Sequence, residues 1–132
     1  DEIKEIVKKI KGSSENEDIN QEVFRPWGSY MTLLRGPGFQ VKIIKINSNQ
    51  AISLQYHKFR EEHWVILKGR GTVQIDKKER RIKKGDYIHI KRNEIHRIHN
   101  IGKQILSLIE VQLGTSTSEK DIVRIEDLYG RK

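Results

Sequence analysis

The stretch SLQYHKFREEHWVILKG (residues 53–69) decides how this chain folds, because it has the pattern of two short strands joined by a turn. Polar and apolar side chains alternate on both sides of its charged middle, and alternate side chains of a strand share a face. Gln55 and His57 therefore point to one side of the first strand. Glu62 and His63 are neighbours in the second strand and must point to opposite sides, unless a bulge intervenes.

The polar residues converge if both strands turn the faces of Gln55, His57 and Glu62 toward the interior. Three nitrogen and oxygen donors inside an apolar barrel are costly to bury unless a partner satisfies them, and a divalent cation does so. A fourth ligand has to come from another strand. The later run HRIHN supplies His96, while His99 of the same run falls on the opposite face.

Most of the chain after Phe24 has the same strand pattern, rich in β-branched residues and separated by Gly, Asn, Asp or Lys. We expect strands at residues 41–46, 52–57, 63–68, 71–76, 79–84, 86–90, 96–100 and 104–112. Such strands without helical segments between them predict an all-β sandwich or barrel. The run RPWG is typical of a rigid turn that leads into it, and the tail at 118–130 is typical of a strand or short helix.

The beginning of the chain differs from the rest. Residues 1–11 carry Ile and Val at helical spacing with Lys and Glu between them, and a glycine and a polar run then break the pattern. We predict a short N-terminal helix and a linker over residues 1–21, and one β domain over residues 22–132.

Composition excludes several classes of function. The chain has 132 residues and no cysteine, so it is long enough for one packed domain but has no disulfide, thiolate metal site or cysteine nucleophile. No apolar run approaches the roughly 18 residues of a membrane span, and no signal peptide is visible. We therefore expect a cytoplasmic protein without a membrane partner.

The net charge of +8 comes from 26 Lys and Arg residues against 18 Asp and Glu residues. These basic residues are scattered, and no zinc finger, aromatic RNA-binding motif or basic helix accompanies them, so a nucleic-acid partner is not expected. The densest basic run, Lys77–Lys84, is typical of a solvated hairpin. A basic excess also suits a small anionic substrate such as a sugar phosphate.

Two spacings match the motifs of cupins. The first motif, G-x5-H-x-H-x(3,4)-E-x6-G, aligns with Asn49, Gln55, His57, Glu62 and Gly69, where Asn replaces the first Gly and Gln the first His. The second, G-x5-P-x-G-x2-H-x3-N, aligns with Gly85, Lys91, Asn93, His96 and Asn100, where Lys and Asn replace Pro and the second Gly. The chain therefore resembles a cupin, which implies a double-stranded β-helix, also called a jelly-roll barrel.

Longer runs point to one group of cupins. They are RPWGSY (25–30), LQYHKFREEHW (54–64), HRIHN (96–100), IEVQLG (109–114) and DIVRIEDLYGR (121–131). These runs closely resemble type II phosphomannose isomerases, which in many microbes form the C-terminal part of a bifunctional mannose-1-phosphate guanylyltransferase/mannose-6-phosphate isomerase. The resemblance implies metal-dependent interconversion of mannose 6-phosphate and fructose 6-phosphate, and a guanylyltransferase domain as a partner that is absent from these residues. The chain departs from the family at Lys58 and Phe59, where two further histidines are common.

The implied reaction moves a proton between C1 and C2 of the sugar through an enediol. A metal with open coordination positions polarises the sugar oxygens as a Lewis acid. The expected ligands present two nitrogens and two oxygens, a set that suits Zn²⁺ and tolerates Co²⁺, Mn²⁺ or Ni²⁺. They are Gln55, His57, Glu62 and His96.

Charged residues beside the ligands are the candidates for contact with substrate. Arg60 matches the arginine of the family's motif, so we expect it to bind the phosphate or the developing enediolate. Lys58 and Arg97 are further candidates for the phosphate. Glu61 flanks a ligand and is the candidate base, with Arg60 as the second catalytic residue. We expect His63, turned away by strand parity, to pack or to support the site without binding the metal.

Two other functions stay open at this point. The chain could be a cupin that binds a metal or a sugar without turnover, as a regulatory or dimerising appendage of a guanylyltransferase. It could also be a different cupin enzyme, although an oxygenase would prefer three histidines around iron and a sugar-nucleotide epimerase would lack the metal set. In every case the open edges of the barrel favour a homodimer.

Overall fold

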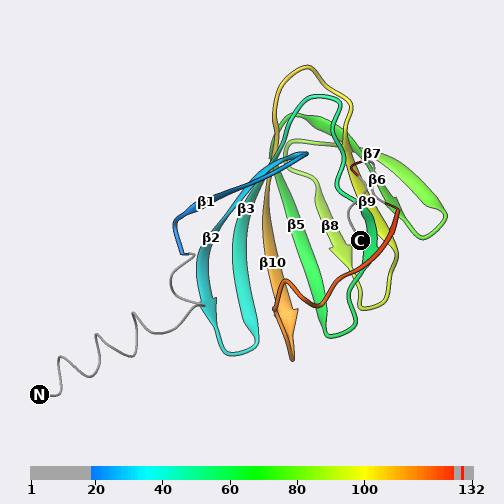
Figure 1. The fold of residues 1–132 in the computed structure, drawn as a ribbon. Helices are drawn as coiled ribbons and strands as arrows, with labels where there is room; N and C mark the ends of the chain where they lie inside the picture. Colours follow the sequence, from blue (N-terminus) through cyan, green and yellow to red (C-terminus); the bar gives the residue numbers. More distant parts are fainter. Residues whose placement is uncertain (1–18, 127–128, 130–132) are drawn as a thin grey trace, which may run out of the picture.

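The computed structural model describes residues 19–126 and residue 129, and this part of the chain is built of strands and the turns between them (Figure 1). The strands form two antiparallel sheets, with the orders β1-β2-β3-β10-β5-β8 and β11-β4-β9-β6-β7. Their bounds are β1 Glu22–Arg25, β2 Gly28–Gly36, β3 Phe39–Ile46, β4 Leu54–Tyr56, β5 Arg60–Lys68, β6 Arg70–Ile75, β7 Lys78–Lys83, β8 Tyr87–Ile90, β9 His96–Asn100, β10 Leu106–Gly114 and β11 Val123–Glu126.

The all-β prediction is confirmed. A strand lies at each predicted range, with ends that differ by a few residues, and the tail forms a strand that pairs with β4. The structure adds the β1–β2 hairpin, which turns at Pro26 and Trp27, where the sequence predicted a rigid turn. The predicted helix at residues 1–11 and the first part of the linker lie outside the described residues, so the boundary between residues 21 and 22 stays a prediction.

Gly28, the first residue of β2, shows why that hairpin needs a glycine. A Cβ atom at this position would lie 2.0 Å from the carbonyl oxygen of Lys45 in β3. The two strands pair directly there, with Gly28 opposite Ile46. Any side chain would therefore push β2 away from the rest of its sheet.

Strand alternation builds the apolar core between the sheets. In β5, Trp64 and Ile66 are buried, whereas His63 and Val65 lie on the other face. The buried core residues are Trp27, Ile46, Ile52, Trp64, Ile66, Val73, Ile82, Ile88, Ile90, Ile98, Leu106 and Leu108. Both tryptophans of the chain, Trp27 and Trp64, belong to this core.

The interior changes from apolar to polar along β10. Leu106 is buried at one end of this strand, and Glu110 and Gln112 are buried on the same face toward the other end. Lys42 of β3 is also buried and stands opposite Glu110 in the pairing of the two strands. One end of the barrel is therefore lined with polar side chains, and the candidate site lies there.

The hairpin β6–β7 projects the basic run Lys77–Lys84, whose residues are exposed except for Ile82. This exposure confirms the predicted solvated hairpin. Within residues 19–126 and residue 129, no helix has the length and apolar character needed to cross a membrane.

Candidate metal centre

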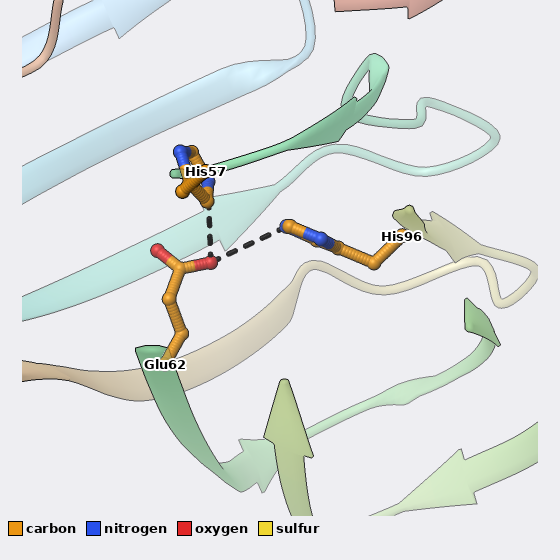
Figure 2. A group of neighbouring side chains, drawn as sticks. All are labelled: His57, Glu62 and His96. Carbon is orange, nitrogen blue, oxygen red and sulfur yellow. Dashed lines mark ion pairs between the residues drawn. The ribbon is translucent and has the colours of Figure 1, made fainter. Parts of the chain in front are cut away.

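His57, Glu62 and His96 meet at the polar end of the interior. His57 follows β4, Glu62 lies in β5 and His96 begins β9. One ligand atom from each residue lies within 4.8 Å of those of the other two, and all three side chains are buried. Figure 2 shows both imidazole rings beside one oxygen of the Glu62 carboxylate, with a dashed line from each ring to that oxygen; these contacts are ion pairs only when the rings are protonated. Two sheets thus contribute to one cluster.

Backbone carbonyl groups select the tautomer of both imidazole rings. His57 Nδ1 lies 2.5 Å from the carbonyl oxygen of Asp121, and His96 Nδ1 lies 2.9 Å from that of Glu94. A carbonyl oxygen only accepts a hydrogen bond, so each Nδ1 carries a proton and donates it. In the neutral rings, both Nε2 atoms therefore present lone pairs to the interior, as metal-binding histidines do.

The atoms around these two lone pairs show whether the residues fit a metal. The Nε2 atoms of His57 and His96 lie 3.5 Å and 3.3 Å from Oε1 of Glu62, so lone pairs face a carboxylate oxygen. His96 Nε2 is buried and makes no hydrogen bond. A buried polar atom without a partner costs about 1–3 kcal/mol. A divalent cation between the three residues would satisfy all of these atoms, so the cluster fits such an ion.

Gln55 lies beside the cluster. It stands directly opposite His96 in the pairing of β4 with β9, so the two side chains share a face. Gln55 lines the same pocket, and its Oε1 accepts a hydrogen bond of 3.1 Å from Ser53 Oγ. Its part as a fourth ligand stays a prediction.

Arg60, the first residue of β5, is buried against the cluster. Its Nη2 donates to Oε2 of Glu62 at 3.1 Å and lies 3.3 Å from His57 Nε2, while Nη1 donates to the carbonyl of Ser118 at 3.2 Å. Burial lowers the pKa of Arg60, but nearby carboxylates, Glu62 first, raise it above its usual value. The guanidinium is therefore charged. It holds Glu62 in place, and its buried Nε makes no hydrogen bond.

Glu110 is a second buried carboxyl group in this pocket. Its Oε1 accepts from Trp64 Nε1 at 3.1 Å and its Oε2 accepts from Gln112 Nε2 at 2.9 Å. Burial, followed by the charge of Glu62, raises the pKa of Glu110 well above its usual range. Burial also raises the pKa of Glu62, but a hydrogen bond with Glu110, the Arg60 charge and both histidines lower it well below that range. Without a metal, Glu110 therefore holds the proton and Glu62 the charge.

Basic side chains other than Arg60 also line the pocket. They are Arg25, Lys42 and Arg124. Lys42 is buried, forms an ion pair with Glu119, and places its Nζ 4.2 Å from the centre of the Tyr30 ring. The pocket therefore has an excess of positive groups around the cluster, which favours an anionic ligand.

Three residues of the site were not predicted from the sequence, although two of them carry a signal. They are Glu110, Lys42 and Asp121. Glu110 shares strand parity with Leu106, and Lys42 shares it with Ile46, so each is a charged residue on the apolar face of its strand. Asp121 carries no such periodic signal. Its carboxylate accepts hydrogen bonds of 2.9 Å from two backbone N–H groups of the turn after His57, and so fixes that turn.

Lys58 and Arg97 lie outside the pocket. Lys58 is exposed in the turn after β4. Arg97 turns to the outer face of the second sheet, where its Nε donates to a backbone carbonyl at 3.0 Å and its Nη1 lies 3.3 Å from Glu126 Oε1. The structure therefore does not bring these two predicted phosphate contacts to the cluster.

Glu61 also lies away from the cluster, because it faces the outer side of β5. Its Oε1 lies 2.6 Å from Nε2 of His63, which has the same strand parity. The predicted orientations of Glu62 and His63, inward and outward respectively, are confirmed by their burial and contacts. The predicted catalytic carboxylate is therefore separated from the pocket by its own strand.

Comparison with known proteins supplies the family. The family described as "Mannose-6-phosphate isomerase C-terminal" matches residues 12–127. Mannose-1-phosphate guanylyltransferase ManC of Salmonella typhimurium is 38% identical over 98% of this chain, and alginate biosynthesis protein AlgA of Pseudomonas aeruginosa is 40% identical over 98%. The chain spans 27% of the length of each relative.

The fold has counterparts among solved structures. The cupin domain of Schizosaccharomyces pombe Cnp3 superposes with a TM-score of 0.63 at 21% sequence identity, over 65% of this chain and 64% of that one. This likeness confirms the predicted cupin fold.

Proposed function

This chain belongs to the family of mannose-6-phosphate isomerase C-terminal domains, and on that premise we propose that it interconverts mannose 6-phosphate and fructose 6-phosphate. The observation that carries the proposal is the pair of histidines whose Nε2 lone pairs face the buried carboxylate of Glu62, with Arg60 beside them. Such a cluster has little value as packing, because apolar residues would fill the same space without the cost of burying charge.

We propose that Gln55, His57, Glu62 and His96 hold one divalent ion, with Zn²⁺ first and Co²⁺, Mn²⁺ or Ni²⁺ as alternatives. When bound, the ion supplies Lewis-acid polarisation of the carbonyl and hydroxyl oxygens at C1 and C2 of the sugar. The protein holds the ligands ready for it, since backbone carbonyls already orient both rings.

The basic residues of the pocket supply the contacts that a sugar phosphate needs. Arg60 is committed to Glu62 through Nη2, and its unpartnered Nε is the donor left for an oxygen that becomes negative during the reaction. Arg25, Lys42 and Arg124 line the same pocket and are better placed for the phosphate than Lys58 or Arg97. Charge-assisted hydrogen bonds of this kind orient the substrate as well as bind it.

Proton transfer between C1 and C2 requires a group that can take and return a proton. We assign this part to Glu110, because it lines the pocket, lies beside Glu62 and is not one of the four expected ligands. Glu61, the base expected from the sequence, lies on the outer face of β5 and would reach the sugar only if that strand exchanged its two faces. A positive charge at the cluster favours the carboxylate form of Glu110, which is the form that accepts a proton.

The alternative is a domain that binds a metal or sugar phosphate without turnover. The relatives named above include a guanylyltransferase and are almost four times as long as this chain, so a second domain of that type is a natural partner for either function. Lys58 and Phe59, which stand where the family commonly has histidines, favour this alternative.

We also propose, for either function, that the protein is cytoplasmic and assembles as a homodimer.

A coupled assay for fructose 6-phosphate formation from mannose 6-phosphate, run with metal analysis and with a chelator, separates the two functions. We expect turnover that the chelator abolishes and added Zn²⁺ or Co²⁺ restores. A chain that contains the metal and binds mannose 6-phosphate but shows no turnover with any of the four metals would establish the non-catalytic alternative.

A further inference from the structure

A second cluster of metal-binding side chains lies on the outer face of the first sheet. It consists of Glu61 and His63 in β5 and His89 in β8. One nitrogen or oxygen atom from each lies within 4.8 Å of those of the other two. Strand parity separates this group from the buried cluster, because Glu61 and His63 flank Glu62 and point the opposite way. The function proposed above does not use it.

The sheet itself brings these side chains together. His63 and His89 stand directly opposite each other in the pairing of β5 with β8. Oε1 of Glu61 lies 2.6 Å from His63 Nε2 and 3.3 Å from His89 Nε2, so one carboxylate oxygen joins both rings. Directly opposed positions have Cβ atoms about 4.5–5.5 Å apart, a spacing at which two histidines can share one ion.

Accessibility and a supporting hydrogen bond favour an ion from solution. The side chains of Glu61, His63 and His89 are 36%, 23% and 35% exposed, so an ion can reach them and water can complete its coordination. Nδ1 of His63 makes a hydrogen bond with the hydroxyl of Tyr87. Without an ion, Nε2 of His63 donates to Glu61 Oε1 at 2.6 Å. Metal binding requires the other tautomer, in which Nδ1 donates to the Tyr87 hydroxyl and Nε2 presents its lone pair, as in other metal-bound histidines.

We propose that Glu61, His63 and His89 form a second divalent-cation site, of the two-histidine and one-carboxylate type that binds Zn²⁺, on the outer surface of the barrel. It is weaker than the buried site. The two rings now stack with centroids 4.3 Å apart and planes inclined by 12°, so they must tilt before their in-plane lone pairs can meet at one ion. Tilting is open to half-exposed side chains, but it makes binding less favourable.

Zinc titration of the whole chain tests this site through stoichiometry, without reference to activity. After treatment with chelator, equilibrium dialysis at micromolar free Zn²⁺ should load two ions per wild-type chain. The double variant His63→Ala/His89→Ala should load one. His99→Ala is the matched control, since it removes a half-buried histidine from the outer face of the other sheet, and it should still load two. Tyr87→Phe should weaken the second ion by about tenfold.

Two results would overturn the proposal. One is equal loading of the wild type and the double variant, with circular dichroism showing both folded. The other is a second ion that His99→Ala removes as effectively as the double variant. The titration also distinguishes this site from the buried centre. An ion that is lost on substitution of His57 or His96 but kept in the double variant belongs to the buried centre alone. Conversely, if the chain binds one ion and only the double variant loses it, the outer site is supported and the buried site is excluded.

Discussion

The two faces of β5 carry clusters of the same composition, two histidines and a glutamate, in different environments. On the inner face His57, Glu62 and His96 are buried, and the two rings lie 5.3 Å apart with their planes inclined by 45°. On the outer face the rings of His63 and His89 are stacked, with 12° between their planes. The adjacent residues Glu61 and Glu62 thus belong to separate clusters.

The difference shows that surroundings, more than residue type, decide what such a cluster can do. Inside, backbone carbonyls fix both rings, and the Nε2 lone pairs face a carboxylate oxygen that is buried away from water. Outside, the rings are held by the side chains of Glu61 and Tyr87, and solvent can satisfy whatever these leave open. The inner cluster is prepared for an ion before the ion arrives, whereas the outer one has to rearrange.

Loss of an inner ligand should have the largest effect. His57→Ala or His96→Ala should remove the metal and lower turnover by several orders of magnitude, because the Lewis acid is lost with it. Metal analysis and the coupled assay measure this, with His99→Ala as the matched control. Either variant should destabilise the barrel less than Ile98→Ala, a core truncation worth about 2–5 kcal/mol. Full metal content in His96→Ala would exclude this cluster as the metal centre.

Glu110→Gln should have the second-largest effect on turnover. The variant keeps the shape of the side chain, and its amide oxygen can still accept from Trp64 or from Gln112, but it cannot take a proton. Turnover should therefore fall by about 10²–10⁴-fold while metal content stays the same. The comparison variant is Glu61→Gln, which changes the carboxylate on the outer face and should keep nearly full turnover. If Glu61→Gln is the inactive one, the base lies on the outer face and our assignment of Glu110 is wrong.

Arg60→Ala should lower turnover by tenfold or more, since a charge-assisted hydrogen bond is worth about 1.5–3 kcal/mol. The metal should remain, because Arg60 contacts Glu62 Oε2 whereas both histidines face Oε1. Arg60→Lys keeps the charge but loses the planar geometry, and should recover part of the activity. Kinetics like those of the wild type in Arg60→Ala would remove this residue from the site.

The buried carboxyl pair should make the stability of the metal-free protein depend on pH. Glu110 has a raised pKa, so its stabilising effect is complete below the ordinary value of 4.5 and is lost as the pH rises through the folded-state value. Glu62 has a lowered pKa, so its contribution is present above 4.5 and is lost as the pH falls through the folded-state value. Thermal melts with chelator should show wild-type stability falling as the pH rises above 4.5.

Glu110→Gln provides the test of that dependence. The neutral amide cannot ionise, so the decline above pH 4.5 should be absent in this variant, whereas the melting temperature of the wild type should fall by a few degrees over the same range. A parallel decline in both proteins would mean that another group is responsible.

Changes to the outer cluster should have the smallest effect on stability and turnover. His63→Ala should keep the buried metal and change the free energy of unfolding by about 0.5 kcal/mol or less, as is usual for partly exposed positions. The hydrogen bond from His63 comes first among the causes that lower the pKa of Glu61, so the small stabilisation from that pair should vanish at acid pH. Loss of the buried metal in His63→Ala would show that the two faces are coupled.

Local patterns in the sequence determined much of this structure. The alternation in residues 53–69 predicted that Glu62 and His63 point to opposite sides, because side-chain direction in a strand repeats every two residues and requires no knowledge of the partner strand. The spacing from Gln55 to Gly69 and from Gly85 to Asn100 likewise led to the cupin fold. The chain-wide strand pattern was enough for the all-β class, although it predicted neither β1 nor β2.

Only the tertiary structure decided which side chains share a site. Glu110 and Lys42 reach the pocket because β10 pairs with β3 and β5, and Asp121 reaches His57 from a segment near the other end of the chain. Glu61 is adjacent to the ligands in sequence, but its side chain contacts His89 of β8 on the outer face of the sheet. Strand parity assigns a face to a residue, whereas the register between distant strands assigns its neighbours, and that register depends on how the whole barrel packs.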